Sequence, residues 1–270
     1  MTTSPPAAAQ YNEHELLVRP RHLAGRGPLP VMQPLLHLHE WPYQFDRSLA
    51  QVVATSPCRR IEIAMEPHQI FHLYRVSVRK HPADQVPYWQ ATFSQDTPGE
   101  IVGAFVQAIA ADRYTMPEEI VAEPTASPTT AWRPLLKAGW QLKDDPEFVR
   151  LASPDETTTV TYFPTLTDDR CGKGVGAWMA ESSFGPEWRD QWTIVLGHST
   201  PVRYAAILAA AVADPTPVLR HRGVLSSAAL PKLATWPARP SDRARRFTAV
   251  EYMAAMFNPR HPGHGHPPRR

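Results

Sequence analysis

The chain has 270 residues, of which 43% are hydrophobic and 20% are charged, and its formal net charge at pH 7 is +2. This composition excludes a wholly disordered chain, and the absence of any run of 18 apolar residues excludes a membrane span. The N-terminus lacks the basic and apolar regions of a signal peptide, and two cysteines, Cys58 and Cys171, are typical of reduced thiols, so we expect a cytoplasmic protein.

The first half of the chain predicts a short helical or irregular segment, then strands, then a helix. The segment ends near Trp41, and alternating or β-branched patterns predict strands at 50–55, 60–65, 72–79 and 88–93. Thr97-Pro98-Gly99-Glu100 predicts a helix start with a capping box, in which threonine caps the helix and Glu100 completes the box. Ile101, Phe105 and Ile109 then form one apolar stripe.

The second half repeats this order after a proline-containing linker. We expect a segment ending near Trp140, strands at 148–152, 157–163, 175–181 and 191–196, and a helix from 201 to about 214. A last helix is expected within 241–257, followed by a disordered end. The inward register of five tryptophans predicts that they belong to the core, while Trp188 is left open. These are the tryptophans at 41, 89, 140, 178 and 192.

The two halves correspond at an offset of 103 residues, which matches Trp89 to Trp192 and Thr97 to Thr200. A period near 100 residues is typical of a duplicated domain. We therefore expect a disordered N-terminal tail (1–15), a first repeat (16–116), a linker (117–131), a second repeat (132–216) and a basic C-terminal segment (217–270) with a possible helix and a disordered tail.

The predicted fold class is α+β. It consists of two tandem repeats, each a four-stranded antiparallel sheet followed by a helix, and the repeats are related by a pseudo-two-fold axis. This order looks like that of Whirly and PC4-like single-strand binders, by analogy at the level of the fold.

Several short stretches resemble a known family. They are the segment Pro20 to Gly25, the Ser-Pro turns at Ser56 and Ser153, the Phe184-Gly185-Pro186 turn and the Thr-Pro helix start after a tryptophan. Together they resemble the SPDY-type domain of actinobacteria, which is named for a Ser-Pro-Asp-Tyr stretch and often occurs as a tandem pair. The name motif is partial here, since Ser56-Pro57 lacks the aspartate and Ser153-Pro154-Asp155 lacks the tyrosine. The resemblance supplies no catalytic residues.

Motifs that could carry catalysis are weak. The glycine-rich stretch 172–176 lacks the spacing of a phosphate-binding loop and leads into a predicted strand. The twelve histidines have no cysteine or acidic partner that recurs at metal-ligand spacing. No pair of acidic or basic residues is surrounded in the sequence by apolar residues, as a catalytic acid and base often are. We therefore expect neither catalytic residues nor a metal or other cofactor, and predict that the protein is not an enzyme.

A sheet backed by a helix on one side has one free face, and in the first repeat that face carries basic and aromatic residues. Arg60, Arg75 and Arg79 could meet phosphates, and Tyr88 could stack a base. Two other interpretations stay open, namely a plain solvated face and the surface on which the two repeats pack. The corresponding strands of the second repeat carry no cluster of bases.

The C-terminal segment is strongly basic, with ten Lys and Arg against two acids between residues 217 and 270. Arg243, Arg245 and Arg246 would add non-specific attraction for an anionic partner, although basic tails are also common as solvated ends. The sequence favours a non-enzymatic nucleic-acid-binding protein, with single-stranded DNA preferred. The alternative is a protein-interaction or scaffold module that binds no nucleic acid.

Overall fold

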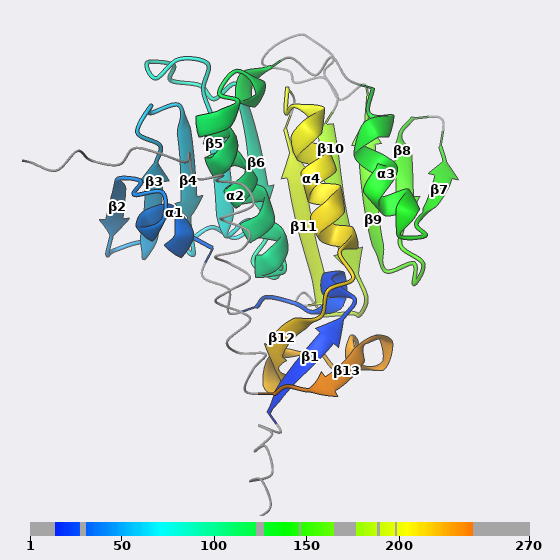
Figure 1. Cartoon of the computed structure of the whole chain (residues 1–270). Coiled ribbons are helices and arrows are strands. Elements are labelled where there is room, and N and C mark those ends of the chain that lie inside the picture. The colour runs from blue at the N-terminus through cyan, green and yellow to red at the C-terminus, as the bar shows by residue number, and fades with distance from the viewer. Residues whose placement is uncertain are drawn as a thin grey trace, which may run out of the picture.

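The chain folds as an α+β protein with mostly antiparallel sheets. The computed structural model describes residues 14–27, 31–122, 127–145, 147–164, 177–187, 190–197 and 199–239. Within these ranges the chain forms a ten-stranded sheet, a three-stranded sheet and four α-helices (Figure 1).

The large sheet combines strands from both halves of the chain in the order β2-β3-β4-β5-β6-β11-β10-β9-β8-β7. The first half contributes β2 (Tyr43–Asp46), β3 (Gln51–Thr55), β4 (Ile61–Met65), β5 (Tyr74–Val78) and β6 (Trp89–Phe93). The second half contributes β7 (Gln141–Asp144), β8 (Val149–Ala152), β9 (Thr158–Phe163), β10 (Ala177–Ser183) and β11 (Gln191–Leu196). The halves meet edge to edge, because β6 pairs with β11 in antiparallel register.

The four helices lie on one face of this sheet (Figure 1). They are α1 (Gln33–His37), α2 (Gly99–Thr115), α3 (Thr129–Lys137) and α4 (Val202–Ala213). The contacts run α1 to α2, α2 to α4 and α4 to α3, so the two long helices cover the centre of the sheet. The short helices cover its flanks, which leaves the opposite face without a helix from the described part of the chain.

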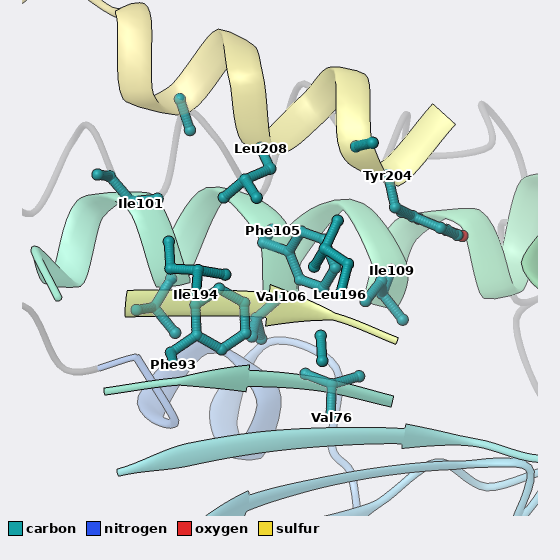
Figure 2. Packing of buried hydrophobic residues seen from close by; sticks show 14 of the residues in the cluster. Val76, Phe93, Ile101, Phe105, Val106, Ile109, Ile194, Leu196, Tyr204 and Leu208 are labelled. Atoms are coloured by element: carbon teal, nitrogen blue, oxygen red, sulfur yellow. The ribbon is translucent and has the colours of Figure 1, made fainter. Parts of the chain in front are cut away.

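A single hydrophobic core lies between the helices and the sheet and contains residues of both halves. The predicted stripe of α2 is confirmed, since Ile101, Phe105 and Ile109 are fully buried, and Figure 2 shows them against the sheet. From α4, Tyr204 and Leu208 enter the same cluster. The five tryptophans predicted to be in the core are all buried, whereas Trp188 lies outside the described residues.

The sheet differs from the prediction in its number of strands. Four strands were expected in each repeat, and the structure adds an edge strand to each, β2 and β7. Both edge strands have four residues and one neighbour, so they bury too little apolar surface to leave a clear pattern. On β2 the side chains of Tyr43 and Phe45 are more than half exposed.

The predicted capping box at the start of α2 is wrong. No side chain caps this helix, and Thr97 Oγ1 instead lies 3.2 Å from Ser94 Oγ. The carboxylate of Glu100 is bound by Arg220, with Nη2 at 2.6 Å from Oε2. The Glu100 carboxylate, which the capping box would have used, is therefore engaged in a long-range ion pair.

The second sheet joins the two ends of the described chain and was not predicted. Its order is β12-β1-β13, from β1 (Glu15–Arg19), β12 (Val218–His221) and β13 (Ala234–Pro237). Short 3-10 helices lie at Arg21–Leu23, Glu119–Val121, Arg222–Val224 and Leu230–Lys232. The predicted helix within 241–257 lies outside the described residues, and none of the described helices is long and apolar enough to cross a membrane.

Candidate functional site

The helix-free face of the first five strands carries polar side chains, as the alternation predicted. Glu62 lies opposite Ser77, Ser77 lies opposite Gln90, and Arg75 lies opposite Thr92. Because cross-strand partners point to the same side of a sheet, these five residues share one face. The two repeats join through β6 and β11, so this face is not the surface on which they pack.

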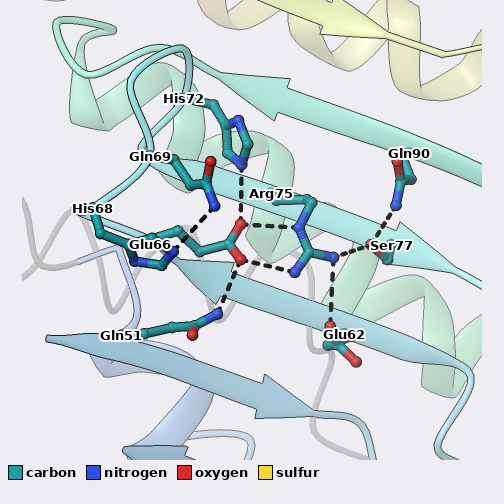
Figure 3. A network of polar contacts seen from close by, with 9 residues as sticks. All are labelled: Gln51, Glu62, Glu66, His68, Gln69, His72, Arg75, Ser77 and Gln90. Atoms are coloured by element: carbon teal, nitrogen blue, oxygen red, sulfur yellow. Dashed lines mark hydrogen bonds and ion pairs between the residues drawn. The ribbon is translucent and has the colours of Figure 1, made fainter. Parts of the chain in front are cut away.

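Arg75 is fully engaged by neighbours on this face (Figure 3). Its guanidinium donates two hydrogen bonds of 2.9 Å to the carboxylate of Glu66, and Nη1 donates to Ser77 Oγ at 2.8 Å. Nη1 also lies 3.5 Å from Oε1 of Glu62. This bidentate arrangement leaves Arg75 little capacity to meet a phosphate.

Glu66 is the centre of that network. Its side chain is 6% exposed, and its carboxylate also accepts from His72 at 3.0 Å and from Gln51 at 2.9 Å. Burial acts to raise the pKa of Glu66, but the hydrogen bonds and charge of Arg75, followed by those of His72, hold that pKa below its ordinary value. The network is therefore an internal polar cluster with its charges compensated.

The structure brings the other three predicted residues of the first repeat together at one end of β4, β5 and β6. Arg60 Nε donates to the backbone carbonyl of Arg79 at 3.4 Å. The backbone N–H of Tyr88 donates to the carbonyl of Val78, and the ammonium of Lys80 lies 4.0 Å from the centroid of the Tyr88 ring. These residues thus form a cluster at the end of the strands, which Glu62 links to Arg75 because it lies 3.5 Å from both Arg75 and Arg79.

Four residues that the sequence analysis did not select extend this cluster. Arg113 and Tyr114, at the end of α2, line a cavity of about 290 Å³ together with Arg60. Arg59 and Lys80 flank the predicted arginines in the chain. We call the whole set the basic end: Arg59, Arg60, Arg79, Lys80, Tyr88, Arg113 and Tyr114.

The cations of the basic end are largely free of carboxylates. Within the described residues, their one ion pair joins Arg79 to Glu62 at 3.5 Å. The Arg113 guanidinium lies 3.8 Å from the ring centroid of Tyr114. Arg113 and Tyr114 both line the cavity, and a cation beside an aromatic ring can bind an anionic group and a flat ring at the same time.

The remaining predicted site residues, Arg243, Arg245 and Arg246, lie outside the described residues, as does the glycine-rich stretch 172–176. The exposed Cys58 is a free cysteine and lines the same cavity as Arg60.

The two Ser-Pro turns have the same construction. Ser56 Oγ accepts a hydrogen bond from the N–H of Ile61 at 3.0 Å, and Ser153 Oγ accepts one from Thr158 at the same distance. In each case a serine closes the turn that leads into a strand. The third position differs, because Cys58 stands in the first turn and Asp155 in the second.

The family SPDY, a domain of unknown function (DUF317), matches the chain twice, at residues 55–116 and 152–218. Each match begins beside a Ser-Pro turn and ends just after a long helix, α2 or α4. The chain carries two SPDY domains. No curated protein and no solved structure matches the chain.

Sequence signals for the missed members of the basic end did exist. Arg59 and Lys80 are adjacent in the sequence to Arg60 and Arg79, which the sequence analysis had already predicted as site residues. Arg113 follows the buried stripe of α2, and only the packing of that helix brings it to Arg60. In the second SPDY domain the equivalent turn carries Asp155, so the domains differ in charge at this end.

Proposed function

We propose that this tandem SPDY protein is a non-enzymatic nucleic-acid-binding protein that prefers single strands and binds them at the basic end. One observation carries the proposal: five cations and two tyrosines gather at one end of a sheet with a single ion pair among the described residues. Phosphates are attracted by such uncompensated cations, and unpaired bases can stack on tyrosines. A cytoplasmic location, consistent with a free thiol at Cys58, is part of this proposal.

The predicted roles change in two respects. Arg60, Arg79 and Tyr88 keep the roles of meeting phosphates and stacking a base, and Arg59, Lys80 and Arg113 join them. Arg75 has a structural role in its carboxylate network. We retain the proposal that Arg243, Arg245 and Arg246 add non-specific attraction.

We also propose that the two domains are related by a pseudo-two-fold axis, in an arrangement like that of Whirly and PC4-like proteins. In support, Thr92 pairs with Val195, its counterpart at the offset of 103 residues. The indole N–H groups of Trp89 and Trp192 both donate to backbone carbonyls at 2.8 Å. Because the bases lie in the first domain, this arrangement provides one binding site per chain.

The test is a titration of a fluorescein-labelled single-stranded 20-mer with the full-length protein, followed by anisotropy at low and moderate salt. We expect binding that weakens steeply with salt and is stronger for the single strand than for a duplex. Arg60→Ala and Arg113→Ala should each weaken binding of the single strand about fivefold. Each should also reduce the slope of the logarithm of the binding constant against the logarithm of the salt concentration by about 0.7 for every phosphate contact that is lost.

Arg47→Ala is the matched control, because it removes an exposed arginine from the same domain, in the turn between β2 and β3. This turn lies at the opposite end of β3 from Arg59 and Arg60, so the variant should leave the affinity for the oligonucleotide within about twofold of wild type. Absence of binding at low salt would contradict the proposal, and so would an Arg47 variant that loses binding while the Arg60 variant keeps it.

A protein partner is the second candidate, and one observation favours it. Ile70 and Phe71, in the loop between β4 and β5, are 87% and 86% exposed. Adjacent apolar side chains this exposed are typical of a protein contact. The double variant Ile70→Ser and Phe71→Ser should keep oligonucleotide binding if the basic end binds nucleic acid, and should abolish capture of a partner if this loop is the contact.

A further inference from the structure

A second, larger cavity lies between the second SPDY domain and the three-stranded sheet. Its volume is about 850 Å³, which is within the range of small-molecule sites. The C-terminal ends of α3 and α4 point toward the three-stranded sheet from one side (Figure 1). The Ser-Pro-Asp turn of the second domain and the segment around His22 complete the lining.

The carboxylates in the lining already have partners. Asp155 accepts from His22 Nε2 at 3.1 Å and from Thr157 Oγ1 at 2.8 Å, and Ser153 donates to it as well. Asp214 is bound by Arg21 Nη2 at 2.7 Å. Arg21 also donates to a carbonyl of the last turn of α4, at Ala211, so the negative end of that helix is compensated too.

The cations in the lining are not compensated in this way. Lys137, at the end of α3, and Lys232, before β13, are exposed and have no ion pair within the described residues. The guanidinium of Arg19 lies 5.0 Å from the ring centroid of Trp236. The lining therefore presents positive charge for which the described fold supplies no counter-ion.

The rest of the lining is mostly apolar. It includes Trp140 and the prolines Pro20, Pro134, Pro154 and Pro215. An apolar wall with a few charged groups at its rim binds a ligand that has an apolar body and a charged head.

We propose that this cavity binds a small organic anion, with a carboxylate or phosphate head between Lys137 and Lys232 and an apolar body against Trp140. The site lies between the second domain and the three-stranded sheet and shares no lining residue with the cavity at the basic end, so it does not rest on the function proposed there. It also places the Ser-Pro-Asp turn of the SPDY domain in the wall of a ligand site.

The experiment uses 8-anilinonaphthalene-1-sulfonate, an aromatic anion, as a fluorescent probe of the full-length protein. The double variant Lys137→Glu and Lys232→Glu should weaken probe binding at least about tenfold. Arg47→Glu, a charge reversal at an exposed position between β2 and β3 of the first domain, should leave binding within about twofold. Ala234→Trp, which fills the cavity without changing the charge, should abolish it, and circular dichroism checks that each variant is folded.

Competition then identifies the head group. Displacement of the probe by phenyl phosphate at lower concentration than by benzoate assigns a phosphate head, and the reverse order assigns a carboxylate. The proposal is overturned if the probe does not bind, if neither competitor displaces it, or if the double variant binds it as wild type does. It is also overturned if Arg47→Glu weakens binding as much as the double variant, since that would indicate general attraction of anions.

Discussion

The guanidinium of Arg75 is held by carboxylates, whereas that of Arg60 meets a backbone carbonyl. The two residues lie on one domain and have the same chemistry, so their partners decide what each can do. Burial makes an unpaired charge costly, and Glu66 therefore needs Arg75 more than a solvated glutamate would. Arg60 forms no ion pair with a carboxylate among the described residues, so its guanidinium can bind a ligand without leaving a buried charge unpaired.

The Glu66 network predicts a dependence of stability on pH. The folded-state pKa of Glu66 lies below its ordinary value of 4.5. At pH values between the folded-state pKa and 4.5, the unfolded chain therefore binds more protons than the folded protein. The contribution of Glu66 to the free energy of unfolding is therefore present above about pH 4.5 and is lost as the pH falls through the folded-state pKa. Glu66→Gln should lower the free energy of unfolding by about 2 kcal/mol at pH 7, and the difference from wild type should shrink below pH 4.5.

Urea denaturation between pH 3 and pH 7 measures this difference. Glu156→Gln is the control, because the side chain of Glu156 is 77% exposed and should contribute little at any pH. A difference between Glu66→Gln and wild type that stays constant down to pH 3 would show that the carboxylate of Glu66 is not stabilised by its partners.

At the scale of elements, an ion pair ties the three-stranded sheet to the start of α2. Arg220 of β12 is 0% exposed and binds Glu100 through both terminal nitrogens, while Nε donates to the carbonyl of Ala24 at 3.0 Å. A Cβ at Gly27 would lie 2.6 Å from the guanidinium, so a glycine at this position lets the backbone lie against Arg220. Burial acts to raise the pKa of Glu100, but Arg220 holds it below the ordinary value.

Removing one partner of this pair should cost more than removing both. Arg220→Leu leaves the Glu100 carboxylate without its counter-ion and should lower the free energy of unfolding by roughly 4 kcal/mol. The double variant Arg220→Leu and Glu100→Leu should recover part of that loss, because no uncompensated charge remains. Chemical denaturation of the single and double variants provides the comparison, and equal stabilities of Arg220→Leu and the double variant would refute a coupled pair.

At the scale of the whole molecule, the two SPDY domains share one sheet and one core. Ile194 and Leu196 of the second domain lie in the same cluster as Phe93 and Phe105 of the first. The helices are also joined, because Arg203 of α4 donates two hydrogen bonds to Asp112 of α2, at 2.8 and 3.0 Å. Neither domain therefore has a core of its own.

This sharing predicts a single cooperative unfolding transition for the described body of the chain. Tryptophan fluorescence and far-ultraviolet circular dichroism should give coincident thermal transitions, with equal calorimetric and van't Hoff enthalpies. Asp112→Asn should lower the one melting temperature without splitting the transition, because it weakens a contact between domains that unfold together. Two resolved transitions, in wild type or in the variant, would mean that the domains fold independently.

Local patterns in the sequence determined most of the elements of the large sheet. Period-two alternation located the inner strands, and the stripe from Ile101 to Ile109 located α2, because burial on one side imposes these periods wherever an element covers a core. The offset between Trp89 and Trp192 likewise revealed the duplication. These patterns are local or periodic, so they can be recognised in the amino-acid sequence without knowledge of the fold.

Only the tertiary structure decided which distant groups meet. In the fold, β1 lies between β12 and β13, and Arg113 lines the same cavity as Arg60. Glu100 forms an ion pair with Arg220 and not the helix cap that the local motif predicts. The fold also gave Arg75 the buried carboxylate of Glu66 as its main partner. Such pairings join residues far apart in the chain and depend on burial and geometry, so no local period records them.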